Sequence, residues 1–104
     1  MKIQINTDSN IVGREQMVSH YEKVLSDALA RFSDHITRLE VHLSDENSHK
    51  EGLEDKRCML EVRLENFKPI AVTHYAPSLH EAVSGATDKL KKSIETSLGK
   101  LKNY

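Results

Sequence analysis

The chain has 104 residues, 30% of them charged, with 15 Lys and Arg against 16 Asp and Glu. A chain of this length buries roughly 65% of the surface that it exposes when unfolded, which suffices for one core and excludes two independent domains. The net charge of −1 excludes a globally basic nucleic-acid-binding protein, so any such binding depends on local charge. The single cysteine, Cys58, excludes an internal disulfide bond and favours a reducing compartment.

The N-terminus shows no targeting segment. Residues 1–6 alternate polar and apolar side chains, whereas a signal peptide needs an apolar stretch of about 7–15 residues. No apolar run approaches the roughly 20 residues that cross a bilayer. We therefore expect a soluble, cytoplasmic protein whose fold begins at Met1 and that has no membrane partner.

The N-terminal half predicts a strand, a helix and a second strand. Residues 2–6 alternate as a short strand does, and the turn-forming residues of 7–13 end it. Over residues 14–32 apolar side chains recur every three or four positions, which is the pattern of an amphipathic helix. Over residues 38–43 the period changes to two, which predicts a half-buried strand. Residues 44–55 contain five acids and one Lys, and this composition predicts a solvated loop.

The C-terminal half predicts two further strands and a long helix. Residues 58–65 alternate again and run back from the loop, which predicts a hairpin. After the turn at 66–69, the β-branched residues of 70–75 predict a fourth strand. The segment Ser78–Glu81 fits a capping box, so a helix begins there, and its apolar positions continue to Leu101.

These elements predict an α+β fold of order β-α-β-β-β-α, with residues 1–104 forming a single domain. A right-handed crossover through the first helix makes strand one parallel to strand two, and the later strands continue the sheet as an antiparallel meander. Both helices then cover one face of the four-stranded sheet. The other face meets water, in agreement with the polar residues at alternate positions of every strand.

Charge is distributed unevenly along the chain. Residues 44–55 carry a net charge of −4, whereas residues 76–104 carry +2. In the last helix Lys89 and Lys92 are three apart on one side of the apolar stripe, with Lys91 close by. Such lysines can follow nucleic-acid phosphates and release counterions. Lysines near a helix C-terminus also offset the macrodipole and aid solubility, so the spacing alone leaves both interpretations open.

The histidines and the cysteine are candidates for a metal-binding or redox site. Six histidines are present, and His42, His49 and His74 are the candidates, but no HExxH or comparable spacing joins them. Cys58 would need a histidine base to act as a nucleophile, and its position in the strand pattern points it into the core. Glycine-rich phosphate-binding motifs and GxSxG are absent. We therefore expect no enzyme, no metal, no cofactor and no small-molecule substrate.

Two aromatic residues, Phe67 and Tyr75, lie near the ends of predicted strands. Such side chains can stack on bases, but only 5% of the chain is aromatic and no RNP-type run occurs. We interpret both as packing residues.

Three segments of the chain, taken together, are similar to those of a known family. They are Ile70-Ala71-Val72-Thr73, Ser78-Leu79-His80-Glu81-Ala82-Val83 and Asp88-Lys89-Leu90. With the order of the elements and Phe32 near the end of the first helix, they resemble the ribosome hibernation promoting factor / ribosome-associated inhibitor A family, also called sigma-54 modulation proteins. The resemblance covers nearly the full chain.

The resemblance implies a fold similar to double-stranded-RNA-binding domains and a role in ribosome hibernation under stress or in stationary phase. The protein would bind 16S rRNA of the small ribosomal subunit and occlude the mRNA and tRNA channel without catalysis. Basic side chains of both helices would contact the RNA, and the matching positions are Lys89 and Lys92, then Lys91, Lys23 and Arg31. Because the chain ends at Tyr104, we expect a short form without the C-terminal dimerisation domain of longer members.

The chain departs from the family at two positions. Asp27 stands where members commonly carry a lysine on the first helix, and Thr96 stands where they carry a basic residue late in the second. Each departure removes a phosphate contact. The alternative function is therefore a protein-interaction module that kept the fold, lost rRNA binding and uses an exposed sheet edge or the polar sheet face.

Overall fold

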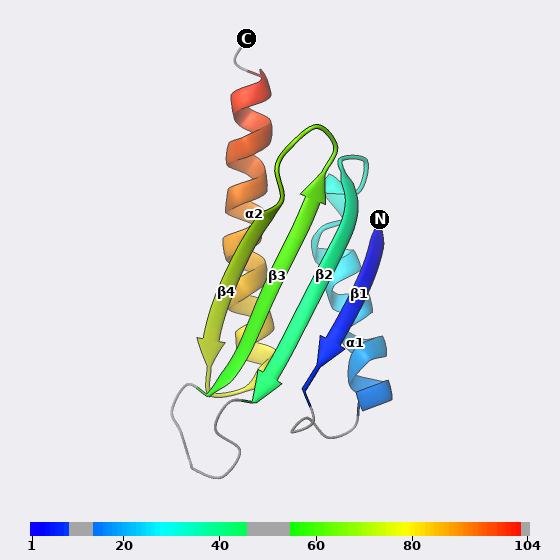
Figure 1. Ribbon diagram of the computed structural model, residues 1–104, viewed down its shortest axis with the longest axis vertical. Coiled ribbons are helices and arrows are strands. Elements are labelled where there is room, and N and C mark those ends of the chain that lie inside the picture. Colours follow the sequence, from blue (N-terminus) through cyan, green and yellow to red (C-terminus); the bar gives the residue numbers. More distant parts are fainter. Residues whose placement is uncertain (9–13, 46–54, 103–104) are drawn as a thin grey trace.

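The computed structural model describes residues 1–8, 14–45 and 55–102, with the side chains of 100–102 left out. Its elements are β1 (Lys2–Thr7), α1 (Arg14–Ala28), the short 3-10 helix η1 (Ala30–Phe32), β2 (Ile36–Asp45), β3 (Lys56–Leu64), β4 (Ile70–Ala76) and α2 (Leu79–Lys102). The predicted order β-α-β-β-β-α is confirmed, and Figure 1 shows α2 running along the sheet. Among the described residues, neither helix combines the length and the apolar character that a membrane crossing requires.

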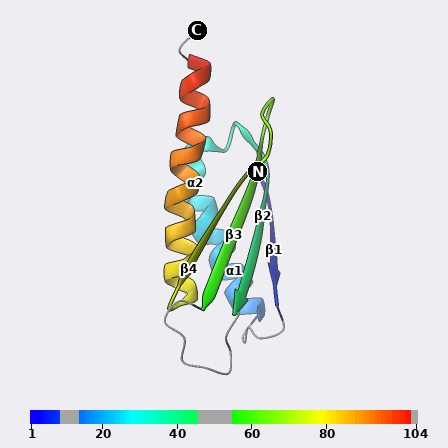
Figure 2. The same ribbon diagram turned by 60° about the vertical axis from the view of Figure 1, so that its left-hand side comes forward.

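The four strands form one sheet in the order β1-β2-β3-β4. As predicted, β1 is parallel to β2, and the other neighbouring pairs are antiparallel. Figure 2 shows both helices on the same side of the sheet, so the expected two-layer arrangement is confirmed as well. The opposite face of the sheet is left without a covering helix.

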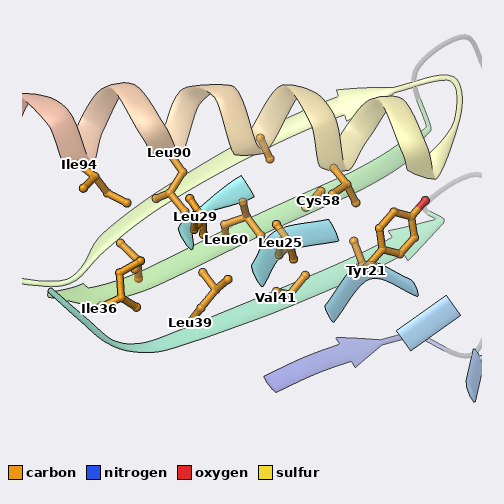
Figure 3. Close-up of a cluster of buried hydrophobic side chains, with 14 of the residues drawn as sticks. Tyr21, Leu25, Leu29, Ile36, Leu39, Val41, Cys58, Leu60, Leu90 and Ile94 are labelled. Atoms are coloured by element: carbon orange, nitrogen blue, oxygen red, sulfur yellow. The ribbon is translucent and has the colours of Figure 1, made fainter. Parts of the chain in front are cut away.

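The core lies between the sheet and the two helices. Leu39, Val41 and Leu60 have no exposed surface, and Val41 is paired directly with Leu60 across β2 and β3. Burying each such side chain stabilises the fold by about 1.5–3 kcal/mol. Figure 3 shows the helix residues that contact them. Leu25 and Leu29 come from the first helical segment, which consists of α1, Leu29 and η1, and Leu90 and Ile94 come from α2.

The first helix is shorter than predicted, so the prediction of a continuous helix to Phe32 was wrong. α1 ends at Ala28, and Leu29 has φ −105° and ψ 11°, outside the helical region. The chain then tightens into η1, in which the Phe32 N–H donates to the Leu29 carbonyl at 2.9 Å. This turn leads the chain toward β2 and keeps Phe32, at 6% exposure, in the core.

The start of α2 follows the predicted capping box. The backbone N–H of Glu81 donates to Ser78 Oγ at 3.1 Å, which satisfies one of the free amides of the first turn. The Ser78 hydroxyl in turn donates to Glu81 Oε2 at 3.1 Å.

The expectation that residues 44–55 form one solvated loop needs correction at both ends. Ser44 and Asp45 belong to β2, and Asp55 is buried at 8% exposure. Lys56 Nζ donates to Asp55 Oδ1 at 2.9 Å and lies 3.4 Å from Asp45 Oδ2. The hydrogen bond to Asp55 is the main reason that the pKa of Lys56 is raised. Residues 46–54 lie outside the described part of the chain.

A close contact joins β4 to α2. A Cβ atom built on Gly85 would lie 2.1 Å from Cδ2 of the His74 ring, whereas one on Gly99 would meet nothing within 4 Å. His74 faces the helix layer because it is paired with the buried Cys58. The absence of a side chain at position 85 therefore lets α2 approach β4 over the imidazole.

The two glycines of α2 give a matched pair of variants. We expect Gly85→Ala to lower the free energy of unfolding by about 1–2 kcal/mol, because overpacking costs about 1–3 kcal/mol and the helix propensity of alanine returns at most about 1 kcal/mol. Gly99→Ala gains only the propensity and should raise the free energy of unfolding by up to about 1 kcal/mol. Urea denaturation of both variants measures the difference, and equal shifts would contradict the contact with His74.

Cys58 points into the core, as its position in the strand pattern predicted. Burial raises the pKa of its thiol to about 12. Burial thus favours the neutral thiol in the folded state. Its contribution to the stability of the fold is fully present below the ordinary pKa of about 9 and is lost as the pH rises from about 9 to about 12. A thiol in this setting is a structural side chain, because nucleophilic attack requires the thiolate.

Alkylation tests the state of this thiol. At pH 8 we expect iodoacetamide to modify Cys58 of the folded protein at least about a hundredfold more slowly than in denaturant, because little thiolate forms and the sulfur is enclosed. Mass spectrometry of timed samples measures both rates. Similar rates in the folded and unfolded protein would mean that the thiol is accessible and poised to react.

Candidate nucleic-acid interface

Lys89 and Lys92 lie on the side of α2 that faces β4. Lys89 Nζ donates to the carbonyl oxygen of Thr73 in β4 at 2.8 Å, although the side chain is exposed. Lys92 lines an open groove with Ile70, at the start of β4. The two strongest candidates from the sequence therefore share one side of the helix, as their spacing predicted.

Lys91 lies on the other side of α2. It lines a pocket of about 170 Å³ between the two helices. The other lining residues are Tyr21, Val24 and Ala28 from α1 and His80, Val83, Ser84, Thr87 and Asp88 from α2. The body of α2 thus separates the Lys91 ammonium group from the side that carries Lys89 and Lys92.

The candidates from the first helical segment lie apart from that side too. Lys23 lines a groove with Met1 and Ile3, at the β1 end of the sheet. Arg31 in η1 forms an ion pair with Glu95 of α2, and its guanidinium lies 4.5 Å from the centre of the Phe32 ring. The pairing compensates the charge of Arg31, although 61% of the side chain is exposed.

Thr96 and Asp27, the two residues at which the chain departs from the resemblance, lie in different parts of the structure. Thr96 lines the same groove as Lys92, so a neutral side chain stands where a second cation would have extended that site. Asp27 is exposed near the end of α1. Of the five predicted RNA-binding residues, only Lys89 and Lys92 are brought together. A lysine ammonium contacts phosphate as a point charge, so these two can position a nucleic-acid backbone without reading its sequence.

The histidines proposed as metal ligands do not converge. His42 is paired with Met59 on the open face of the sheet, whereas His74 lies on the helix face beside Gly85. Since β3 and the thickness of the sheet separate them, they cannot bind one ion. His49 lies outside the described residues, and within those residues no three His, Cys, Asp or Glu side chains form a group that fits a metal.

The open face of the sheet carries basic residues that the sequence reasoning missed. Lys2, Arg38 and Arg63 form one row across β1, β2 and β3. Arg57 lies on the same face, paired with Tyr75. The alternation of polar and apolar residues could have found them, because Arg57 and Arg63 fall an even number of positions apart in one strand.

Comparisons with known proteins agree on the architecture. The sequence matches the family described as sigma 54 modulation protein / S30EA ribosomal protein over residues 3–102. Among solved structures, the N-terminal domain of Protein Y from Thermus thermophilus has a TM-score of 0.72 and 21% identity, covering 92% of this chain and 98% of that one. A ribosomal subunit interface protein from Coxiella burnetii has a TM-score of 0.66 and 19% identity, with 100% of both chains covered. A search of curated proteins found no match.

Proposed function

Since this chain belongs to the sigma 54 modulation protein / S30EA ribosomal protein family, we propose that it binds 16S rRNA of the small ribosomal subunit and keeps the ribosome idle. The family match over residues 3–102 is the observation that carries the proposal. The similar protein from Coxiella burnetii is called a ribosomal subunit interface protein, which supports a position between the subunits. The protein would occupy the mRNA and tRNA channel in the cytoplasm, under stress or in stationary phase, by steric exclusion alone.

Lys89 and Lys92 are the side chains we assign to the rRNA backbone. An ammonium group has three donors, so Lys89 can keep its bond to Thr73 and still donate to a phosphate oxygen. Lys92 is exposed in the neighbouring groove. Lys91 and Lys23 would add contacts from separate grooves, whereas Arg31 would first have to exchange Glu95 for a phosphate.

Charge reversal on α2 tests this assignment. Binding of the wild-type protein to purified bacterial ribosomes should weaken with salt, with log affinity falling by about 0.7–0.9 per neutralised phosphate for each unit of log salt. Lys89→Glu with Lys92→Glu should weaken binding at least about tenfold near 0.1 M salt, because two phosphate contacts are lost. Sedimentation through sucrose at several salt concentrations measures both effects.

Lys68→Glu is the matched control, because it reverses one exposed lysine in the turn between β3 and β4. It should sediment with ribosomes as the wild type does, and thermal melting should show that all the variants are folded. Unchanged binding by the double variant would remove Lys89 and Lys92 from the interface.

A second candidate function is the protein-interaction module. It is favoured by the ion pair of Arg31 with Glu95 and by the carboxylate of Asp27, since both offset positive charge on the helices, and by Thr96, which contributes no cation to the groove of Lys92. This function requires binding to a protein partner that does not weaken as salt rises. Absence of the wild-type protein from ribosomal fractions at every salt concentration would favour it over rRNA binding.

A further inference from the structure

No described element covers the face of the sheet opposite the helices (Figure 2). Two of the cross-strand rows on this face carry its positive charge. One row joins Lys2, Arg38 and Arg63, and the other pairs Arg57 with Tyr75. Along β3 the two rows are six residues apart, which is about 20 Å. Positive charge therefore lies at both ends of the face.

The row of three cations is unfavourable for the fold itself. Like charges directly opposite each other on neighbouring strands destabilise a sheet, and here Arg38 stands opposite both Lys2 and Arg63. Arg38 donates a hydrogen bond to Gln4, and its ion pair with Glu40 at 3.3 Å compensates part of its charge. The packing of the core does not require this row of cations. Because the row lies on an open surface, it is suited to binding an anion.

Within the described strands, two acids of this face form a pair in the next row. Glu40 stands directly opposite Glu61. A hydrogen bond with the side chain of Glu61 is the main cause that lowers the pKa of Glu40, and the charges of Arg38 and Arg63 add to it. Among the described residues of this face, four cations outnumber the acids Glu40 and Glu61, and the charges of two arginines act on Glu40. The balance favours a negatively charged partner.

Tyr75 adds an aromatic surface to the same face. Its side chain is 43% exposed, so the interpretation of Tyr75 as a packing residue was wrong, whereas Phe67 does pack against the core. Arg57 stands beside it across the strand pair, and Met59 is its diagonal neighbour, within reach of an aromatic ring. An exposed ring next to a guanidinium and a thioether is a surface on which a nucleobase stacks.

We propose that the open sheet face binds single-stranded RNA, with a base stacked on Tyr75 and phosphates contacting Arg57 at one end of the face and Arg63 and Lys2 at the other. A single strand fits better than a duplex, because only unpaired bases offer their faces for stacking. The inference goes beyond the proposed function, which uses the helices. Only the choice of RNA over DNA rests on that function.

The test uses the full chain and a fluorescently labelled single-stranded oligouridine of about 12 nucleotides, a length within the range that such surfaces cover. Anisotropy titrations should show binding that weakens with salt. Tyr75→Ala should weaken binding by about 5- to 150-fold, the range that stacking on one aromatic side chain supplies. Tyr75→Phe keeps the ring and should bind as the wild type does.

The charge contribution is tested by a matched pair. Arg63→Glu reverses one exposed cation on the sheet face, and Arg14→Glu reverses one exposed cation at the start of α1. We expect Arg63→Glu to weaken oligouridine binding about tenfold or more and to reduce its salt dependence, while Arg14→Glu changes binding less than about twofold. Circular dichroism melting confirms that each variant is folded.

The outcomes separate this inference from the proposed function. Absence of oligouridine binding by the wild-type protein at about millimolar concentration, equal binding by Tyr75→Ala, or tighter binding of a duplex of the same length would each overturn the sheet-face site. Equal losses in Arg63→Glu and Arg14→Glu would do the same. None of these results depends on ribosome sedimentation, which tests the helix face in a separate assay.

Discussion

The burial of one face of the sheet beneath two helices is the constraint on which the rest of the structure depends. Val41 and Leu60 are fully enclosed there, paired with each other across β2 and β3. Because a strand alternates its side chains, every residue between these core positions must point the other way. The same pairing that builds the core thus gathers Arg38 and Arg63 on the uncovered face. A register shift by one residue would bury those charges, at a cost that no local contact could offset.

The docking of α2 decides how its lysines are used. Its apolar stripe, which includes Leu90 and Ile94, is fully buried against the sheet and the first helical segment. The residues at the two margins of that stripe therefore face different neighbours, β4 on one side and α1 on the other. Lys89 contacts the first and Lys91 lines a pocket with the second, although only one residue lies between them. Residues close together in the sequence of a helix thereby face different parts of the structure.

The positive charge of the protein is divided between two surfaces of different chemistry. On α2, Lys89 and Lys92 offer point charges beside a groove whose further member, Thr96, is neutral. On the open sheet, guanidinium groups lie with an exposed ring at Tyr75. The first surface suits the regular backbone of folded RNA, and the second suits unpaired bases. The chain stays close to neutral overall, because residues 44–55 alone carry a net charge of −4.

The sequence by itself determined the order of the elements, the parallel first pair, the capping box at Ser78 and the inward position of Cys58, because periodicity and local hydrogen bonding act over a few residues. It placed Lys89 and Lys92 on one side of a helix for the same reason. Only the tertiary structure decided where α1 stops, that Arg31 is paired with Glu95, and that Tyr75 stands open while Phe67 is packed. These features depend on residues distant in the chain that meet once the sheet and helices have docked, and no local pattern records such contacts.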